Sequence, residues 1–194
     1  MKVGAEIQQE AAKSAETATE LLKRHSLQLD SPLWQFAARL WRDSAISKEC
    51  LALQSRDWSV TRLLCASWQA SVGLNCYNEP ADVRAWRNLM TSRLRATRLA
   101  LPKDTPCVST LRKTLAQAEL EAERIELALA YALLPRGLAN TAVDTQTLAR
   151  LMSQNLEAAA PDADSMDTDT SNLINTLSDR MTMQVVAQRQ GMAH

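Results

Sequence analysis

All five tryptophans of the chain lie between residues 34 and 86, in a stretch where apolar residues recur every three or four positions. Trp34 and Trp41 are seven residues apart, which is two helical turns, so both belong to one helix face. Ser31 and Pro32 come just before them, and serine caps a helix while proline fits its first turn. The spacing therefore predicts a compact α-helical core.

Turn-forming residues divide the segment 31–134 into five predicted helices. They are expected at residues 32–41, 45–55, 58–72, 81–100 and 108–134. The third is apolar nearly all round, which is typical of a helix surrounded by others. The connection between the last two is short and contains Pro102, so these helices are predicted to form a long antiparallel hairpin. The inward row of the last helix is expected to be Leu111, Leu115, Ala118, Ala122, Ile125, Leu129 and Leu133.

The chain has 194 residues, which suits one domain with extensions. We predict a polar N-terminal extension at 1–30, an all-α core domain at 31–134 and an acidic, largely disordered tail at 135–194. The tail prediction rests on residues 154–179, which contain six acidic residues and neither lysine nor arginine. Two short amphipathic segments flank this run, one with Leu148, Leu151, Met152 and Leu156, and the other with Leu173, Leu177, Met181 and Val185.

No catalytic, cofactor or metal constellation stands out, so we predict a protein that is not an enzyme. The four cysteines are separated by 15, 11 and 31 residues, and both histidines lie outside the tryptophan-rich segment. A zinc site needs closely spaced ligands, and haem needs an axial ligand such as a core histidine. Glu119 and Glu123 share a helix face without the Glu-x-x-His pattern of a di-metal bundle.

Cysteine usage and hydropathy predict a cytoplasmic protein with no membrane partner. Cys50 and Cys65 lie among leucines and alanines, where a free thiol behaves as a small hydrophobe, and this favours a reducing compartment. The N-terminus has no apolar run resembling a signal peptide. No stretch approaches the roughly 20 apolar residues of a membrane span.

The hairpin carries the main concentration of positive charge, although the whole chain is balanced at 22 basic and 22 acidic residues. From Arg84 to Lys113 there are eight basic residues and one acid, Asp104. Such a patch can bind phosphates, nucleic acid or an acidic protein, or it can be a solvated face neutralised within the chain. We expect Glu119, Glu123 and Glu126 to lie opposite Arg84 and Arg87. That register would leave five cations clustered near the turn with little compensation, namely Arg95, Arg98, Lys103, Arg112 and Lys113.

Trp58 differs from the other tryptophans of the first three helices because it opens a helix after a polar stretch. We expect Trp34, Trp41 and Trp68 to pack in the core and Trp58 to be partly exposed. A partly exposed tryptophan is a typical anchor for a protein partner. The same tryptophans could instead line a pocket for a flat ligand.

The run Ser31-Pro32-Leu33-Trp34-x-Phe36-Ala37 with Leu40-Trp41 resembles an uncharacterised family of small proteobacterial conserved hypothetical proteins. The later pieces that carry the resemblance are Cys50-Leu51-Ala52-Leu53-Gln54, the 57–68 helix, Leu94-Arg95 with Arg98, and Ala118-Glu119-Leu120-Glu121-Ala122-Glu123-Arg124. It covers residues 31–134, with Asp43-Ser44 standing where the family pattern often has proline. The resemblance implies a bacterial, cytoplasmic helical domain of unknown function and brings no catalytic residues.

These observations favour a non-catalytic adaptor or regulatory protein that binds another protein through the basic hairpin end or the region of Trp58. The alternative is a nucleic-acid accessory protein that binds RNA or DNA through the 84–113 hairpin. A third hypothesis is a small-ligand binder with a tryptophan-lined pocket. The candidate binding residues are Arg95, Arg98, Lys103, Arg112, Lys113 and Trp58.

Overall fold

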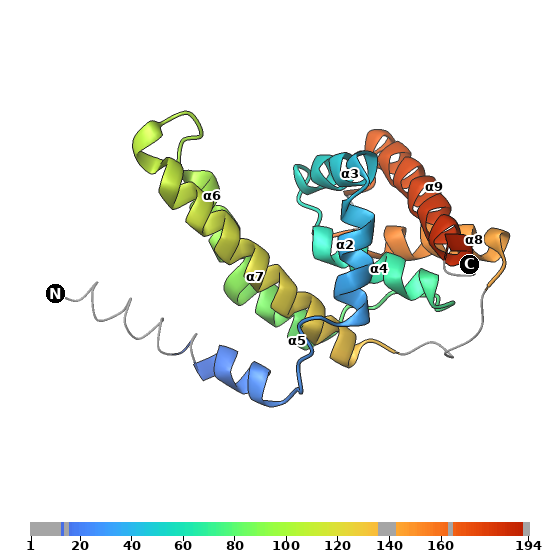
Figure 1. The fold of residues 1–194 in the computed structure, drawn as a ribbon, viewed down its shortest axis with the longest axis horizontal. Helices are drawn as coiled ribbons and strands as arrows, with labels where there is room; N and C mark the ends of the chain where they lie inside the picture. The colour runs from blue at the N-terminus through green and yellow to red at the C-terminus, as the bar shows by residue number, and fades with distance from the viewer. Residues whose placement is uncertain (1–12, 14–15, 136–142, 163–164, 192–194) are drawn as a thin grey trace. The chain divides into compact units, whose positions relative to one another are not determined.

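The computed structural model describes residues 13, 16–135, 143–162 and 165–191, and the regular structure in these ranges is helical, without strands (Figure 1). The α-helices are α2 (Pro32–Trp41), α3 (Ser44–Gln54), α4 (Val60–Ser71), α5 (Ala81–Trp86), α6 (Ser92–Ala100), α7 (Ser109–Leu133), α8 (Thr145–Ala158) and α9 (Thr168–Gly191). A π-helical turn, η1 (Arg87–Thr91), joins α5 to α6, and a 3-10 turn, η2 (Pro106–Val108), precedes α7. Residues 16–23 are also helical. The predicted all-α class is confirmed.

Capping side chains set the first residues of several helices. The Ser31 hydroxyl accepts a hydrogen bond from the Trp34 backbone N–H at 3.2 Å, with Pro32 in the first turn of α2. The Asp43 carboxylate accepts from the backbone N–H of Ala45 at 2.9 Å and caps α3. An aspartate N-cap thus makes the turn at which the resembled family often has proline.

The chain divides into two compact units. Unit 1 consists of Met1–Asp30 and Pro80–Leu133, and unit 2 of Ser31–Glu79 and Leu134–His194. The described part of the polar segment, residue 13 and residues 16–30, therefore belongs with the long hairpin, and α8 and α9 belong with α2, α3 and α4.

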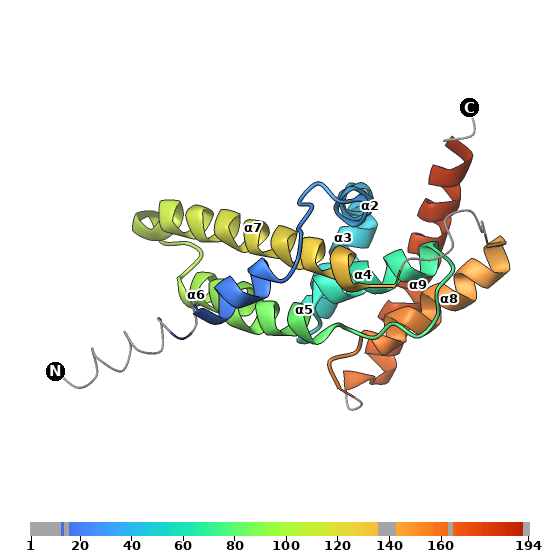
Figure 2. The ribbon, with the colours of Figure 1, turned by 90° about the horizontal axis from the view of Figure 1, so that it is seen from below.

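Unit 2 is a helical core in which α4 packs on α8, and α9 packs on both α8 and α3. Figure 2 shows α4, α8 and α9 side by side. Its fully buried side chains come from every helix of the unit, among them Leu33, Leu40, Ile46, Leu53, Leu63, Leu148, Met152, Leu156, Ile174 and Leu177. Inside this core, Asn155 accepts a hydrogen bond from the Tyr77 backbone N–H and donates to the carbonyls of Ala66 and Leu74.

The prediction of a largely disordered acidic tail is wrong for the residues that the structure describes. Both amphipathic segments are helices of unit 2, α8 and α9, and their apolar faces are buried. The acidic run between them contains the start of α9: the Asp167 carboxylate accepts a hydrogen bond from the Thr170 backbone N–H at 2.7 Å. Residues 136–142, 163–164 and 192–194 lie outside the described residues.

In unit 1, the run of α5, η1 and α6 lies along α7 (Figure 1). Arg87 bonds to Glu126 and Arg98 bonds to Glu119, so residue numbers rise along one run as they fall along the other. The two runs are therefore antiparallel. The expected inward row of α7 is only partly correct: Ala122 and Leu129 are buried, but Leu111 is 50% exposed. Two glutamates, Glu119 and Glu126, are buried instead.

The structure corrects two expectations about the tryptophans. Trp58, expected to be partly exposed, is 1% exposed, because the chain reverses at Asp57 (φ 66°) and the Trp58 N–H bonds back to the Leu53 carbonyl. Trp41, expected in the core, is 40% exposed. It follows Leu40, which is fully buried, and one residue turns a helix by about 100°.

Candidate functional site

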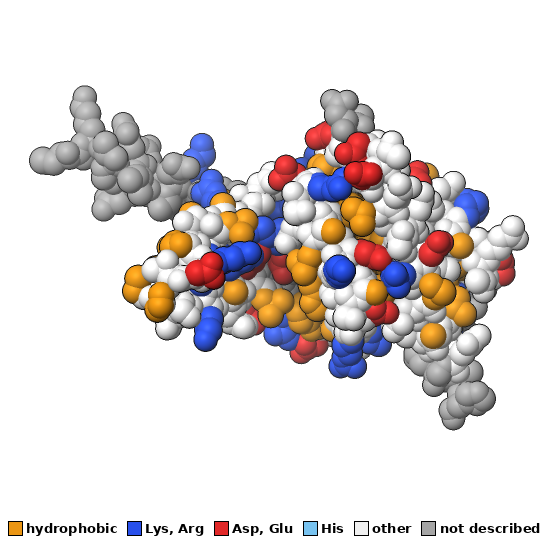
Figure 3. Space-filling view, turned by 90° about the horizontal axis from the view of Figure 1, so that it is seen from above, with side chains coloured by type: hydrophobic (Ala, Val, Ile, Leu, Met, Phe, Trp, Pro, Cys, Tyr) orange, Lys and Arg blue, Asp and Glu red, His pale blue; other side chains and the backbone are white. Residues whose placement is uncertain are grey.

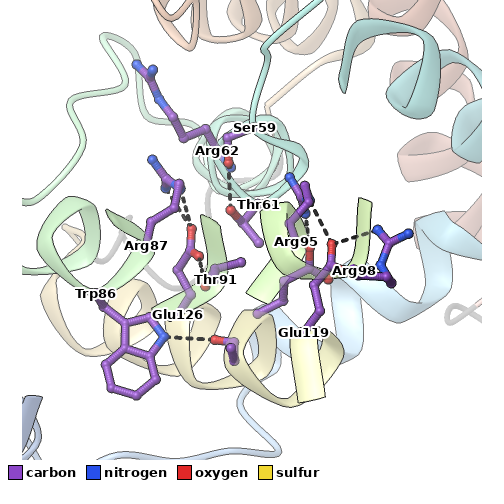
Figure 4. A network of polar contacts seen from close by, with 12 residues as sticks. Ser59, Thr61, Arg62, Trp86, Arg87, Thr91, Arg95, Arg98, Glu119 and Glu126 are labelled. Atoms are coloured by element: carbon purple, nitrogen blue, oxygen red, sulfur yellow. Dashed lines mark hydrogen bonds and ion pairs between the residues drawn. The ribbon is translucent and has the colours of Figure 1, made fainter. Parts of the chain in front are cut away.

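Two arginines of α6, Arg95 and Arg98, point at glutamates of α7. Glu119 accepts a hydrogen bond from Arg95 Nε at 2.7 Å and from Arg98 Nε at 2.5 Å (Figure 4). Arg98 Nη2 also reaches the second oxygen of the Glu119 carboxylate at 3.2 Å. Arg95 Nη2 makes a further ion pair with Glu123 at 2.5 Å. Two arginines and two glutamates thus neutralise one another within the hairpin.

A second buried ion pair lies at the π-helical turn. Glu126, whose side chain is 1% exposed, accepts from Arg87 Nε at 2.8 Å and from the Thr91 hydroxyl at 2.9 Å (Figure 4). Nearby, Trp86 Nε1 donates to the Ala122 carbonyl at 2.9 Å. Arg87 and Thr91 are the two ends of η1, so this irregular turn presents both of its ends to one carboxylate. The π turn therefore has a structural role, since it brings Arg87 and Thr91 within hydrogen-bond distance of Glu126.

The network shifts the pKa values of its members in different directions. Burial raises the pKa of Glu119, but hydrogen bonds from Arg98 and Arg95 outweigh it, and the net pKa is lowered. Burial raises the pKa of Glu123 to about 7, against the charge of Arg95 and with the help of the carboxylates of Glu119 and Glu126. The hydrogen bond to Glu119 raises the pKa of Arg98. Glu119 is therefore held as a carboxylate, whereas Glu123 changes its charge near neutral pH.

The predicted site residues are used in three different ways. Arg95 and Arg98 are paired, so the expectation that they lack compensation is wrong: the actual register places Glu119 and Glu123 opposite them. Arg112 donates to the carbonyls of Arg98, at 2.7 Å, and Leu101. That contact ties the start of α7 to the end of α6. The last of the six candidates, Trp58, is buried in unit 2 and offers no exposed anchor.

Lys103 and Lys113 are exposed and form no ion pair with any residue that the structure describes. They lie at the free end of the hairpin, and Figure 3 shows hydrophobic side chains gathered there, at the left of the coloured surface. Asp104, the residue after Lys103, is also exposed. With Arg112 bonded to neutral carbonyls, three cations and one anion leave the hairpin end with a charge of about +2.

Two half-exposed leucines flank the Arg98–Glu119 pair. Leu99 is 58% exposed and Leu120 is 43% exposed. Each directly follows a member of the facing pair, and one residue turns an α-helix by about 100°. Because α6 and α7 run in opposite directions, this step turns both leucines toward the same side of the hairpin. Lys113 precedes Leu120 by seven residues, or two turns, and shares its face.

We call this surface the Leu99–Leu120 face, comprising Leu99, Leu120 and Lys113, with Lys103 at its free end. This face was not predicted from the sequence, because the predicted register of the hairpin differs from the observed one. If Arg98 faces Glu119, the residues that follow them in sequence must lie on the same side of the hairpin. The face could therefore have been deduced from the pairing, but hydrophobic periodicity does not reveal which residues of the two helices are paired.

Residues 32–129, just over half of the chain, match the family described as protein of unknown function (DUF2390). The chain belongs to this family. The DUF2390 match begins with α2 and ends inside α7, so it contains both ion-pair networks and the Leu99–Leu120 face. No curated protein matches the chain, and no solved structure matches it.

The DUF2390 match excludes α8 and α9, although these helices supply much of the buried surface of unit 2. Within the described part of the chain, no three His, Cys, Asp or Glu residues are grouped so that they could hold a metal ion. No described helix is both long and apolar enough to cross a membrane.

Proposed function

We propose that this protein is a non-catalytic interaction protein that binds a protein partner through the free end of the α6–α7 hairpin. The observation that carries the proposal is the pairing of the α6 arginines with glutamates of α7. Arg95 and Arg98 are paired with glutamates, which leaves a surface of exposed leucines with two lysines rather than a continuous cationic stripe. Exposed apolar residues bordered by charge are typical of protein-binding surfaces.

The same observation weakens the case for a nucleic-acid accessory protein. A phosphate-binding surface needs several cations that are free to neutralise phosphates, and each contributes to the salt dependence of binding. In this hairpin Arg87, Arg95 and Arg98 already contact carboxylates. We also propose a cytoplasmic location, because all four cysteines are free thiols and a reducing compartment keeps them so.

Site-directed photocrosslinking tests the proposal. Cys107 is exposed beside the hairpin end, and a Cys76→Ser variant leaves it as the single exposed thiol for attaching a crosslinker. The labelled full chain is illuminated in bacterial lysate with and without nuclease. Support requires a defined protein adduct that survives nuclease and disappears in a Leu99→Gln, Leu120→Gln variant.

The matched control is Leu51→Gln, because Leu51 is 51% exposed but lies on α3 in unit 2. This change should leave the adduct intact. An adduct that contains only nucleic acid, or a protein adduct equally lost in the control, overturns the proposal. Binding of an RNA or DNA oligonucleotide that falls steeply with added salt would favour the nucleic-acid alternative instead.

A further inference from the structure

The chemistry of the Leu99–Leu120 face restricts what can bind to it. Its apolar centre is formed by one leucine from each of two antiparallel helices, at the level of the Arg98–Glu119 pair. Its charge lies at one end, where Lys103 and Lys113 form no ion pair with any described residue and only Asp104 offsets them. A complementary partner therefore needs apolar side chains at its centre and negative charge toward the hairpin end.

The helical framework of the surface favours a helix as the partner's element. Side-chain ridges of a third helix can pack between the ridges of two antiparallel helices. Ala96 and Ala116, both exposed, are short side chains three positions before Leu99 and four before Leu120, and they allow a close approach. The hairpin has no strand edge to which an extended peptide could add.

We propose that the partner presents an acidic amphipathic helix, which lays its apolar stripe on Leu99 and Leu120 and places its carboxylates beside Lys103 and Lys113. This inference rests on the proposed function and names the class of partner. Apolar residues at positions i, i+3 or i+4 and i+7 form the required stripe. The negative charge belongs at one end of that helix, because only one end of the face is basic.

An anionic lipid surface fits the face less well than a helix does. A membrane would cover the whole side of the hairpin, including the neighbourhood of Leu120, whose next residue Glu121 has a side chain that is 53% exposed. Like charges in that position oppose an anionic surface. A helix is narrow enough to align its carboxylates with the lysines and to leave Glu121 in water.

Selection from a displayed library of helix-forming peptides of about 18 residues tests the inference on the full chain. We expect the enriched peptides to carry the apolar stripe with Asp or Glu grouped toward one end. Their binding, measured by fluorescence anisotropy, should weaken at least about tenfold in Leu99→Gln, Leu120→Gln and in Lys103→Glu, Lys113→Glu. Leu51→Gln should bind as the unchanged protein does, and circular dichroism checks that each variant keeps its helices.

Three results overturn the inference. One is enrichment of basic or non-helical peptides, and another is binding that is unaffected by the hairpin variants. The third is binding of the full chain to vesicles of anionic phospholipid that is lost in the same variants. The photocrosslinking experiment distinguishes failure of this inference from failure of the proposed function. A protein adduct that depends on Leu99 and Leu120, together with a failed peptide selection, would support the protein-binding function and contradict the acidic helix as its partner.

Discussion

Arg98 and Glu119 form a two-point ion pair across the hairpin, with Arg98 Nε and Nη2 lying 2.5 Å and 3.2 Å from the two oxygens of one carboxylate. Such a fork fixes orientation as well as distance, because both groups are planar. Arg95 bonds to the same carboxylate, so a single glutamate holds two arginines of α6. This carboxylate therefore helps to set the register of α6 on α7.

Replacing Glu119 with glutamine should destabilise unit 1. The Glu119 side chain is 8% exposed, and its loss of charge leaves two partly buried arginines without their main partner. Breaking such a pair from one side costs about 2–3 kcal/mol, less than for a fully buried pair because both arginines retain some contact with water. Hydrogen exchange of α6 and α7 amides, measured by mass spectrometry, reports the change.

Glu121→Gln is the matched control for this measurement. Glu121 lies two residues along α7, its side chain is 53% exposed, and its ion pair with Arg124 is 3.8 Å long. Its replacement should change the free energy of unfolding by less than about 0.5 kcal/mol. Equal exchange rates in the two variants would show that the Glu119 pair does not set the stability of the hairpin.

The stability of unit 1 should fall as the pH rises from about 4.5 to about 7, because of Glu123. Its pKa is raised from 4.5 to about 7 by burial, so the folded state binds the Glu123 proton more tightly than the unfolded state. The resulting stabilisation is complete below pH 4.5 and lost as the pH rises through 7. Glu119, whose pKa is lowered, acts in the opposite sense: its stabilisation is lost as the pH falls below 4.5.

Glu123→Gln isolates the Glu123 contribution, because glutamine stays neutral at every pH. Relative to this variant, the unchanged protein should lose about 1–3 kcal/mol of unfolding free energy between pH 5 and pH 8. Urea unfolding at a series of pH values measures the difference. Parallel pH profiles for the two proteins would show that the Arg95 ion pair keeps Glu123 ionised throughout this range.

How far the fold follows from the sequence differs between the helices. The start of α2 was predictable, because Ser31 and Pro32 are local signals that act within one turn. The register of α6 on α7 was not predictable, because periodicity shows which residues share a face but not how far one helix is shifted along another. The eight residues between Ala100 and Ser109 permit several shifts, and the contact of Arg98 with Glu119 selects one.

The acidic segment after α8 shows a second limit of sequence reasoning. Its Asp, Ser and Thr residues are typical of disorder, yet the same residue types cap helices. Asp167 caps α9 and also lies 3.3 Å from Arg56, a contact between parts of the chain 111 residues apart. The composition of the segment shows that it is acidic but does not show that Arg56, far away in sequence, contacts it. The spacing of Leu148, Met152 and Leu156 was the more reliable signal.

Asn155→Leu should destabilise unit 2 by about 2–4 kcal/mol. The buried amide of Asn155 satisfies the Tyr77 N–H and the carbonyls of Ala66 and Leu74, and leucine satisfies none of them. Unpaired buried backbone groups account for most of the expected loss. Urea unfolding followed by circular dichroism gives the value. Gln154→Leu, at an exposed position next to it, should change the unfolding free energy by less than about 0.5 kcal/mol, and an equal loss in both variants would contradict this account.

Thiol reactivity should divide the four cysteines into two classes. Cys76 and Cys107 are exposed, whereas Cys50 and Cys65 are buried, and burial raises the pKa of the Cys50 thiol to about 12. The thiolate is the reactive form, so Cys50 has almost none at pH 8. A colorimetric thiol reagent should therefore modify two thiols rapidly in the native protein and all four after denaturation. Rapid modification of Cys50, identified by peptide mapping, would mean that unit 2 opens readily.

Truncation after residue 134 should unfold unit 2, because α8 and α9 form part of its core. The two helices contribute six apolar side chains with no exposed surface, namely Leu148, Met152, Leu156, Ile174, Leu177 and Met181. Removing even one such side chain costs about 2–5 kcal/mol, and a whole domain is stable by only about 5–15 kcal/mol. The segment 31–134, which the sequence suggests as a complete domain, should therefore not retain a folded α2–α4 core.

The emission of the buried Trp58 and the protease sensitivity of α2–α4 both report this unfolding. The control is a chain shortened by residues 192–194 alone, which should behave as the full chain does. A truncated chain with cooperative unfolding and protected α4 amides would show that the DUF2390 segment folds without α8 and α9. The predicted result would instead show that α2–α4, which lie inside the family match, need α8 and α9 in order to fold, although these two helices lie outside it.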